Sequence, residues 1–168
     1  MVIYRHYSLN MIKINEYNNM INNFKLLSFA LLVGFSTLTS AQDITGLWQS
    51  IDDKTSEVKA IIEIKPNDQG IYTGTIKTIT PRIGYQPKEF CYKCPEPYTN
   101  QPILGLKTVT GLKLTKDNEY ADGKVIDPLT GKIYSLKAKL SANGNRLNLR
   151  GYVGISTIGR NQTWLRVK

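Results

Sequence analysis

The stretch K-I-Y-S-L-K-A-K-L-S-A-N-G-N-R-L-N-L-R-G-Y-V, Lys132–Val153, decides the fold. Over Lys132–Leu140 apolar residues alternate with polar ones that include Lys137 and Lys139. Arg146–Val153 alternates in the same way, and the small and polar residues between the two segments are typical of a tight turn. Because side chains on a strand point alternately to opposite faces, the stretch predicts two half-buried strands of a meandering antiparallel sheet.

The same alternation recurs along most of the chain after residue 42. We expect further strands at Gly46–Ser50, Val58–Ile64, Ile71–Ile79, Leu104–Thr110, Leu112–Thr115, Tyr120–Ile126 and Thr163–Lys168. This number of short strands predicts an all-β fold, either a small antiparallel up-and-down barrel of about eight strands or a sandwich. A barrel has no unpaired strand edges, and its interior is either filled by side chains or holds one small ligand.

The N-terminal region is typical of a secretory signal. Lys25 precedes the uncharged run L-L-S-F-A-L-L-V-G-F, Leu26–Phe35, and the small residues Thr39–Ala41 follow it. As a helix, ten residues span only about 15 Å, which is too short for a hydrocarbon core of roughly 30 Å. We therefore expect a signal peptide over residues 1–41, cleaved between Ala41 and Gln42, rather than a membrane anchor or a buried helix. The candidate start codons are Met1, Met11 and Met20.

Cleavage there leaves one domain, residues 42–168, without histidine. His6 is the only histidine, and it precedes the cleavage site. Three of the 22 basic residues and one of the 13 acidic residues also precede it, so the remainder carries 19 against 12, a net charge of +7. Without imidazole the domain lacks His-based triads and His metal ligands, and we expect no metal and no cofactor. We expect the protein in the periplasm or outside the cell, where nucleic acid is not a partner.

Two tryptophan motifs lie at the ends of this domain. Gly46-Leu47-Trp48 opens the first expected strand, and Trp164-Leu165-Arg166 lies on the last. In a barrel that pairs its first strand with its last, an arginine could stack on the indole of Trp48. This spacing is similar to the closure of lipocalin-like barrels, with Gly46, Trp48 and Arg166 as structural residues and Arg160 as the alternative partner. Two ordinary, partly buried tryptophans are the simpler interpretation.

The two cysteines form the motif Cys91-Tyr92-Lys93-Cys94. In an exported protein an even cysteine count favours a disulfide, and we expect one between Cys91 and Cys94. Pro95 and Pro97 argue against the helix that a reactive thiolate would need. Two thiolates fall short of the four ligands of a zinc site unless two chains share the ion. A redox-active pair and free thiols are the remaining alternatives.

Charged side chains give the other candidates for function. Adjacent Asp52 and Asp53 on a strand would point apart, so they favour turn capping over carboxylate catalysis, and we assign no catalytic residue. Arginines crowd the last quarter of the chain, as a solvated face or as an anion site. If an anion site is present, the candidate ligand-binding residues are Arg150, Tyr152 and Arg160. This basic charge could also hold the protein at anionic lipid or polysaccharide.

Five motifs together resemble a known family. They are G-L-W-Q-S-I-D-D-K-T (Gly46–Thr55), C-Y-K-C (Cys91–Cys94), Q-P-I-L-G-L (Gln101–Leu106), G-K-V-I-D-P-L-T-G-K-I-Y (Gly123–Tyr134) and R-G-Y-V-G-I-S-T-I-G-R-N-Q-T-W-L-R (Arg150–Arg166). The resemblance is to exported bacterial proteins with domain of unknown function 2147. It implies an exported, lipocalin-like barrel of unassigned role and supplies no catalytic residues. Ser56 departs from the glycine expected after the turn.

These observations favour a binding protein over an enzyme. The leading hypothesis is an exported small barrel that binds a small apolar or anionic envelope molecule, such as a lipid. One alternative is a structural or interaction protein of the cell envelope with a filled barrel and a basic surface. The other is an enzyme that uses a carboxylate or the cysteine pair, which would need convergent acids or an exposed reactive thiol.

Overall fold

The computed structural model describes residues 43–52, 55–81, 84 and 86–168. The chain divides into two units, Met1–Ala41 and Gln42–Lys168, and all described residues belong to the second. The predicted signal peptide and its cleavage site therefore lie outside the described residues. Within the described part of the chain, no helix is long and apolar enough to cross a membrane.

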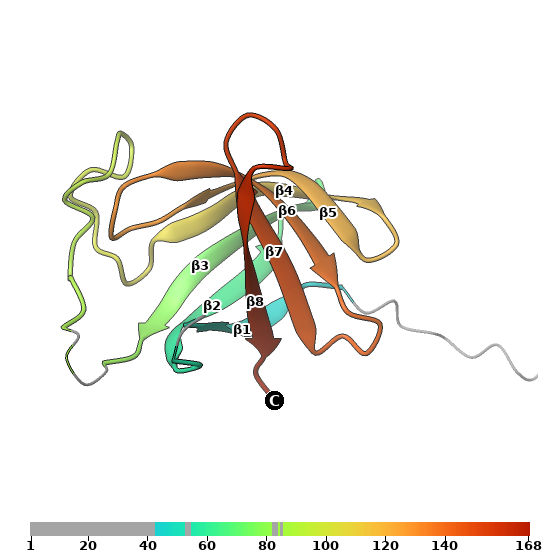
Figure 1. The fold of residues 1–168 in the computed structure, drawn as a ribbon, viewed down its shortest axis with the longest axis horizontal. Coiled ribbons are helices and arrows are strands. Elements are labelled where there is room, and N and C mark those ends of the chain that lie inside the picture. Colours follow the sequence, from blue (N-terminus) through green and yellow to red (C-terminus); the bar gives the residue numbers. More distant parts are fainter. Residues whose placement is uncertain (1–42, 53–54, 82–83, 85) are drawn as a thin grey trace, which may run out of the picture. The chain divides into compact units, whose positions relative to one another are not determined.

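Eight strands form one closed antiparallel barrel (Figure 1). Each strand pairs with the next, and the last strand returns to the first. This confirms the predicted all-β fold, a small antiparallel up-and-down barrel of about eight strands. The strands are β1 (Gly46–Ile51), β2 (Val58–Pro66), β3 (Ile71–Ile79), β4 (Lys107–Lys116), β5 (Glu119–Ile126), β6 (Ile133–Leu140), β7 (Arg146–Tyr152) and β8 (Gly159–Arg166).

Two strand predictions need correction. The segments expected at Leu104–Thr110 and Leu112–Thr115 are parts of the single strand β4. The chain continues through Gly111 because this glycine takes a φ of 72°, and the register between β3 and β4 shifts at the same place. Strand β8 begins earlier than the predicted Thr163, since its pairing with β7 already starts at Gly159.

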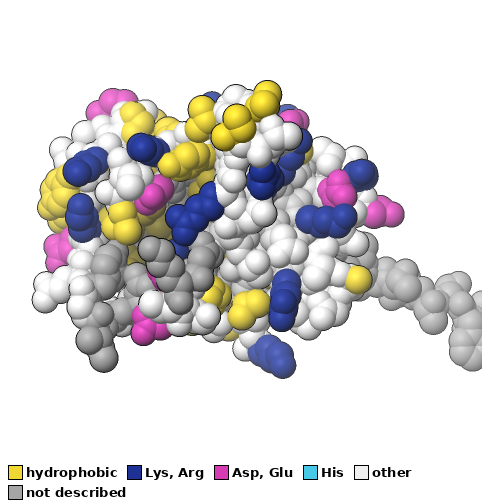
Figure 2. Space-filling view, viewed as in Figure 1, with side chains coloured by type: hydrophobic (Ala, Val, Ile, Leu, Met, Phe, Trp, Pro, Cys, Tyr) yellow, Lys and Arg dark blue, Asp and Glu magenta, His cyan; other side chains and the backbone are white. Residues whose placement is uncertain are grey.

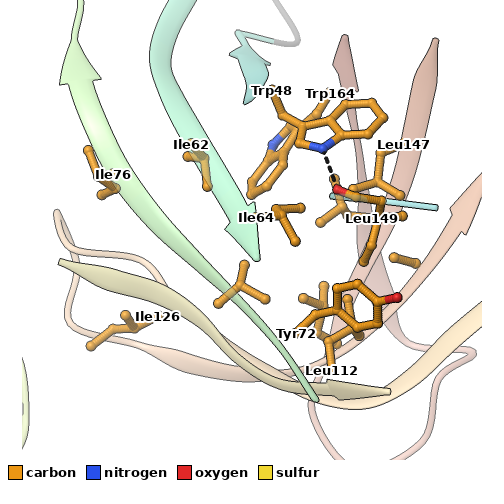
Figure 3. Close-up of a cluster of buried hydrophobic side chains, with 14 of the residues drawn as sticks. Trp48, Ile62, Ile64, Tyr72, Ile76, Leu112, Ile126, Leu147, Leu149 and Trp164 are labelled. Carbon is orange, nitrogen blue, oxygen red and sulfur yellow. Dashed lines mark hydrogen bonds between the residues drawn. The ribbon is translucent and has the colours of Figure 1, made fainter. Parts of the chain in front are cut away.

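Alternate residues of the strands point into the barrel and build its core. Figure 3 shows Trp48, Trp164, Leu147, Ile62 and Ile76 pointing into the barrel from five different strands. All five side chains are buried. The alternation that predicted each strand is therefore the alternation between core and solvent, as for any sheet that buries one face.

The connections fall at two ends of the barrel because successive strands run in opposite directions. The first end carries the longer connections, between β1 and β2, β3 and β4, β5 and β6, and β7 and β8; we call it the loop end. The second carries the three short turns and the segment before β1, and we call it the turn end. The β3–β4 connection, residues 80–106, is much longer than the others.

Candidate functional site

An arginine lies over a tryptophan at the turn end. The guanidinium carbon of Arg166 is 4.3 Å from the centroid of a Trp48 ring, a cation–π contact. The register of β1 with β8 makes these two residues partners. A methyl group on Gly46 would come within 3.1 Å of an Arg166 nitrogen, so glycine leaves room for the guanidinium. Arg160 lies at the far end of β8, so it is not the residue that stacks on Trp48.

The segment before β1 lies against this pair and closes the turn end. Arg166 donates hydrogen bonds to the carbonyl oxygens of Asp43 (2.6 Å), Thr45 (2.7 Å) and Gly144 (2.7 Å). The indole nitrogen of Trp48 donates to the carbonyl oxygen of Ile44 at 2.8 Å, the dashed line in Figure 3. Ile44 is fully buried. The structure thus brings together the residues expected for closure and adds the backbone that they hold.

Two tyrosines complete the turn end. Tyr72 donates a hydrogen bond to a carboxylate oxygen of Asp43 at 3.1 Å. Its ring packs edge-on against that of Tyr120, with centroids 5.3 Å apart. Burial, followed by the negative charge of Asp43, raises the pKa of Tyr72 to about 12, and burial also raises the pKa of Tyr120. Both phenols therefore stay protonated at neutral pH, and they pack in the core, where Tyr72 donates its hydrogen bond to Asp43, rather than act as bases.

The interior nearer the loop end holds several polar groups. Ser50 follows Trp48 by two residues on β1 and faces the same way, and only 6% of its surface is exposed. Its hydroxyl has no hydrogen-bond partner among the described residues. On the neighbouring strand, the Trp164 indole nitrogen donates to the Gln162 side-chain oxygen at 3.1 Å, and the Gln162 amide donates to the Ile51 carbonyl at 3.3 Å.

The wall of the interior next to these polar groups is apolar. Ile62, Ile76 and Ile126 come from β2, β3 and β5 and face inward (Figure 3). Thr108 is the other buried polar residue of the core, and its hydroxyl donates to the carbonyl oxygen of Ile126 at 2.7 Å. Ser50 therefore differs from Thr108 in having no such partner in the described part of the chain. An apolar interior with a few convergent polar groups is the usual character of a small-molecule site.

The cysteine pair lies in the β3–β4 connection and forms the predicted disulfide. The Cα atoms of Cys91 and Cys94 are 5.4 Å apart, and both side chains are buried. Their sulfurs lie 3.6 and 3.9 Å from the carbonyl oxygen of Pro128, in the β5–β6 turn. The disulfide thus packs against a second connection of the loop end. An attacking thiolate would have to reach a buried sulfur, which argues against a redox site.

Aspartates cap two turns of the loop end, and one of them is Asp52, which was considered for catalysis. Asp127 accepts hydrogen bonds from the backbone nitrogen of Leu129 at 3.0 Å and from the hydroxyl of Thr130 at 2.8 Å. Asp52 accepts one from the backbone nitrogen of Thr55 at 3.2 Å. Asp53 lies outside the described residues. The turn continues through Ser56 at a φ of 60°, a left-handed conformation that explains why glycine is expected there.

The three predicted ligand-binding residues lie near the β7–β8 loop, residues 153–158, but on two faces. Arg150 and Tyr152 are on the outer face of β7, and Lys137 lies above the Tyr152 ring at 5.8 Å. Arg160 is the second residue of β8 and pairs with Gly151, on the side of the strand that carries Gln162 further along. The structure therefore brings Arg150 and Tyr152 together and separates Arg160 from them. Binding of a ligand by these residues stays a prediction.

Arg150 has a structural task that the sequence did not reveal. Its guanidinium donates to the carbonyl oxygen of Ser156, to that of Thr157 at 2.9 Å and to the Asn161 side-chain oxygen at 2.7 Å. The first two acceptors belong to the β7–β8 loop. Arg150 therefore fixes the shape of this loop from its base.

A shallow groove of about 560 Å³ crosses the outer faces of β5 to β8. Its lining includes the basic residues Lys137, Lys139 and Arg150 and the amides of Asn148 and Asn161. One acidic residue, Glu119, also lines it, and hydrogen bonds from Lys139 and Lys116 lower the pKa of this carboxyl. Basic side chains outnumber the single acidic one in this groove, and it lies outside the barrel rather than within it.

Comparison with known proteins identifies a family and a solved structure of similar fold. A family described as "Uncharacterized protein conserved in bacteria (DUF2147)" matches residues 46–166. The chain belongs to this family. No curated protein matches it. A solved structure, protein HP1028 from the human pathogen Helicobacter pylori, described as belonging to the lipocalin family, is similar with a TM-score of 0.63. The two sequences are 20% identical, and the match covers 75% of this chain and 84% of the other.

At that identity the likeness shows the fold alone, and it agrees with the closed eight-stranded barrel. The DUF2147 chain therefore has a lipocalin-like fold, as the resemblance implied. Its most informative interior residue, Ser50, was not among the predicted site residues. The sequence carried one signal for it: Ser50 follows Trp48 by two residues on the same strand, so its hydroxyl is expected to face inward with the Trp48 side chain.

Proposed function

We propose that this protein binds a small amphiphilic molecule inside the barrel, near the loop end. The observation that carries the proposal is the hydroxyl of Ser50, which is buried in the interior and has no partner among the described residues. A buried hydroxyl without a hydrogen bond costs about 1–3 kcal/mol. A ligand whose polar head accepts or donates a hydrogen bond there would remove this cost.

The surroundings of Ser50 define the class of ligand. Ile62, Ile76 and Ile126 offer contact to an aliphatic body. Gln162 offers amide groups beside Ser50, because its neighbour Trp164 pairs with Ser50 in the register. Arg160 lies further along the same side of β8 and favours a negatively charged head. A fatty acid or another small anionic lipid has both parts.

The test is a titration of the purified protein with dodecanoic acid, followed by the fluorescence of Trp48 and Trp164, the two tryptophans of the chain. Both indoles lie in the core, so a ligand that enters should change their emission. We expect saturable binding and a 1:1 mass by native mass spectrometry. An unchanged emission together with no bound mass would contradict the proposal.

Two substitutions locate the site. Ala60→Phe adds bulk beside Ser50, its register partner, and should block binding, whereas Ala142→Phe in an exposed turn at the turn end should not. Ser50→Ala removes the hydroxyl without adding bulk, so it should weaken binding while leaving the fold as stable as before or more so. If Ser50→Ala stabilises the protein and the variant binds dodecanoic acid as tightly as the wild type, the hydroxyl is not part of the site.

Export belongs to the proposal as well. The pattern of Lys25, Leu26–Phe35 and Thr39–Ala41 supports a cleaved signal and a role in the periplasm or outside the cell. N-terminal sequencing of the protein recovered from the cell envelope or medium should begin at Gln42. Recovery of His6 in the accumulated protein would contradict export by this signal.

The outer groove supports a second candidate, the binding of an anionic polymer at the surface of the envelope. Three basic side chains and two amides line it, a composition suited to the acidic groups and hydroxyls of a charged polysaccharide. Binding of dextran sulfate should then fall steeply between 50 and 500 mM salt, on the order of tenfold or more, because screening weakens exposed ion pairs. Lys137→Gln should lower it at low salt. Binding that ignores both changes would exclude this candidate.

A further inference from the structure

The β7–β8 loop exposes aliphatic side chains that the rest of the molecule does not cover. Val153, Ile155 and Ile158 are 69%, 65% and 72% exposed. The loop stands above the barrel in Figure 1, and Figure 2 shows hydrophobic side chains at its tip with Lys or Arg side chains beside them. Large apolar side chains grouped on one exposed loop are typical of a surface that binds a membrane or another molecule.

The loop is ordered rather than loose. Arg150 donates to the carbonyl oxygens of Ser156 and Thr157, and Ile158 donates its backbone nitrogen to the carbonyl oxygen of Ile155 at 3.2 Å. Gly154 supplies a left-handed residue, with a φ of 69°, between Val153 and Ile155. These contacts fix the backbone that carries the aliphatic residues. The loop thus presents them to solvent before any partner binds, which lowers the ordering cost of insertion.

The charge around the loop identifies the partner. The chain contains no acidic residue after Asp127, whereas the exposed basic residues Lys132, Lys137 and Arg160 lie in the β5–β6 turn, on the outer face of β6 over the Tyr152 ring, and next to the loop at the start of β8. Aliphatic residues flanked by basic ones are the combination that binds the surface of an anionic bilayer. A second copy of the chain fits less well, because it would bring two basic faces together.

The acidic residues of the loop end lie elsewhere. Asp52 and Glu57 belong to the β1–β2 connection, and Glu89 and Glu96 belong to the β3–β4 connection. Asp127 belongs to the β5–β6 turn, where its carboxylate accepts hydrogen bonds from Leu129 and Thr130. The surface free of acidic residues is therefore the β7–β8 loop together with the outer faces of β6 to β8. This is the part of the molecule that can approach anionic headgroups without repulsion from its own carboxylates.

We propose that the β7–β8 loop docks the protein on an anionic lipid bilayer. Val153, Ile155 and Ile158 enter the boundary between headgroups and acyl chains, while the basic side chains nearest the loop, Lys137 and Arg160, contact the headgroups. The proposal goes beyond the binding of a ligand inside the barrel and does not depend on it. A protein whose barrel binds no ligand would still dock on the bilayer. A protein with a substituted β7–β8 loop would still bind dodecanoic acid if the barrel site exists.

The experiment is co-sedimentation of the chain from residue 42 with vesicles of phosphatidylglycerol and phosphatidylcholine in equal parts, against vesicles of phosphatidylcholine alone. We expect the mixed vesicles to bind at least about tenfold more protein at low salt, and 500 mM salt to remove most of this difference. Equal binding to both vesicles, or none to either, would overturn the proposal.

Variants test the role of the loop. The triple substitution Val153→Ser, Ile155→Ser and Ile158→Ser should reduce binding to mixed vesicles at least about tenfold, since each removes apolar surface that would be buried. The matched control, Leu47→Ser with Leu114→Ser, alters two exposed leucines outside the loop and should bind as the wild type does. If the control variant loses as much vesicle binding as the triple variant, then any exposed apolar side chain contributes to membrane binding wherever it lies. That result would overturn the assignment of docking to the β7–β8 loop.

Two further measurements separate the remaining outcomes. An unchanged melting temperature of the triple variant shows that lost binding is not lost folding, as the exposure of these residues leads us to expect. A fluorescent label sensitive to polarity, attached at Ile155→Cys, should shift to shorter wavelength when vesicles are added. If sedimentation velocity instead finds a dimer that the triple variant abolishes, and the label does not respond to vesicles, the loop joins two copies and the proposal is wrong.

Discussion

The substitution Gly131→Ala tests how the loop end is built. Gly131 lies in the β5–β6 turn, has a φ of 75°, and faces the connection that contains the disulfide. A methyl group built on it would lie 1.8 Å from the carbonyl oxygen of Lys93 and 3.0 Å from the backbone nitrogen of Cys94. The clash is with backbone on both sides, so no side-chain movement can relieve it.

The control is Gly70→Ala, in the turn between β2 and β3. Gly70 has nearly the same φ, 71°, but nothing lies within 4 Å of a methyl group there. A left-handed alanine costs about 1–2 kcal/mol, offset by about 0.4–1 kcal/mol from the smaller entropy of the unfolded chain. We therefore expect Gly70→Ala to lower the free energy of unfolding by about 1 kcal/mol.

Gly131→Ala carries the same conformational cost plus the clash. Either the turn or the Cys91–Cys94 segment must move by more than 1 Å, since Cβ contacts under 3.0 Å are essentially never seen. Forced overpacking costs about 1–3 kcal/mol, so the total should be about 3 kcal/mol. For a domain of this size 1 kcal/mol corresponds to about 4 °C, which gives a melting temperature about 12 °C below the wild type against about 4 °C for the control.

Urea unfolding followed by tryptophan fluorescence measures both variants. Limited proteolysis within residues 80–106 should also speed up in Gly131→Ala and not in Gly70→Ala, because only the first loosens that connection. If the two variants lose the same stability within about 0.5 kcal/mol, the β3–β4 connection does not pack on the β5–β6 turn as described.

Three shorter predictions follow from the turn end and the disulfide. Arg166→Lys should lower the free energy of unfolding by about 2 kcal/mol, because a lysine cannot both stack on the Trp48 ring and donate hydrogen bonds to three carbonyl oxygens. The exposed control Arg146→Lys should change the free energy of unfolding by less than about 0.5 kcal/mol, and urea unfolding of both variants measures the difference. The raised pKa of Tyr72 means that its contribution to stability is complete below about pH 10 and is lost as the pH rises towards 12, so Tyr72→Phe should flatten the fall of the urea midpoint between pH 10 and 12. Replacing Cys91 and Cys94 by alanine should cost about 2 kcal/mol, since the closed loop is short, and should leave dodecanoic acid binding intact; a loss of binding without a loss of stability would revive a direct role for the pair.

Periodicity predicted the strands where one face is buried along the whole segment. Val58–Ile64 and Lys132–Leu140 are such segments, and the structure contains both. The prediction failed at Gly111, because a bulged glycine inside β4 has the same appearance in the sequence as a turn between two strands. Local pattern cannot distinguish these cases, since the partner strand decides between them.

The closure at the turn end could be predicted because it uses residues fixed at the two ends of the barrel, Trp48 on β1 and Arg166 on β8. The loop end could not, because its contacts join segments with no common period. The packing of the disulfide on Pro128 depends on the path of a long connection. The task of Arg150 depends on where a loop carbonyl points. Both are set by tertiary structure alone.

The pairing of β1 with β8 has a consequence for how the molecule is made. Trp48 meets Arg166, and the backbone nitrogen of Val167 donates to the carbonyl oxygen of Leu47. A chain synthesised from its N-terminus must keep one side of β1 unpaired until β8 has emerged. During that interval the exposed edge is open to pairing with a neighbouring nascent chain. A truncation that removes β8 would leave this edge of β1 unpaired in the finished molecule and favour aggregation.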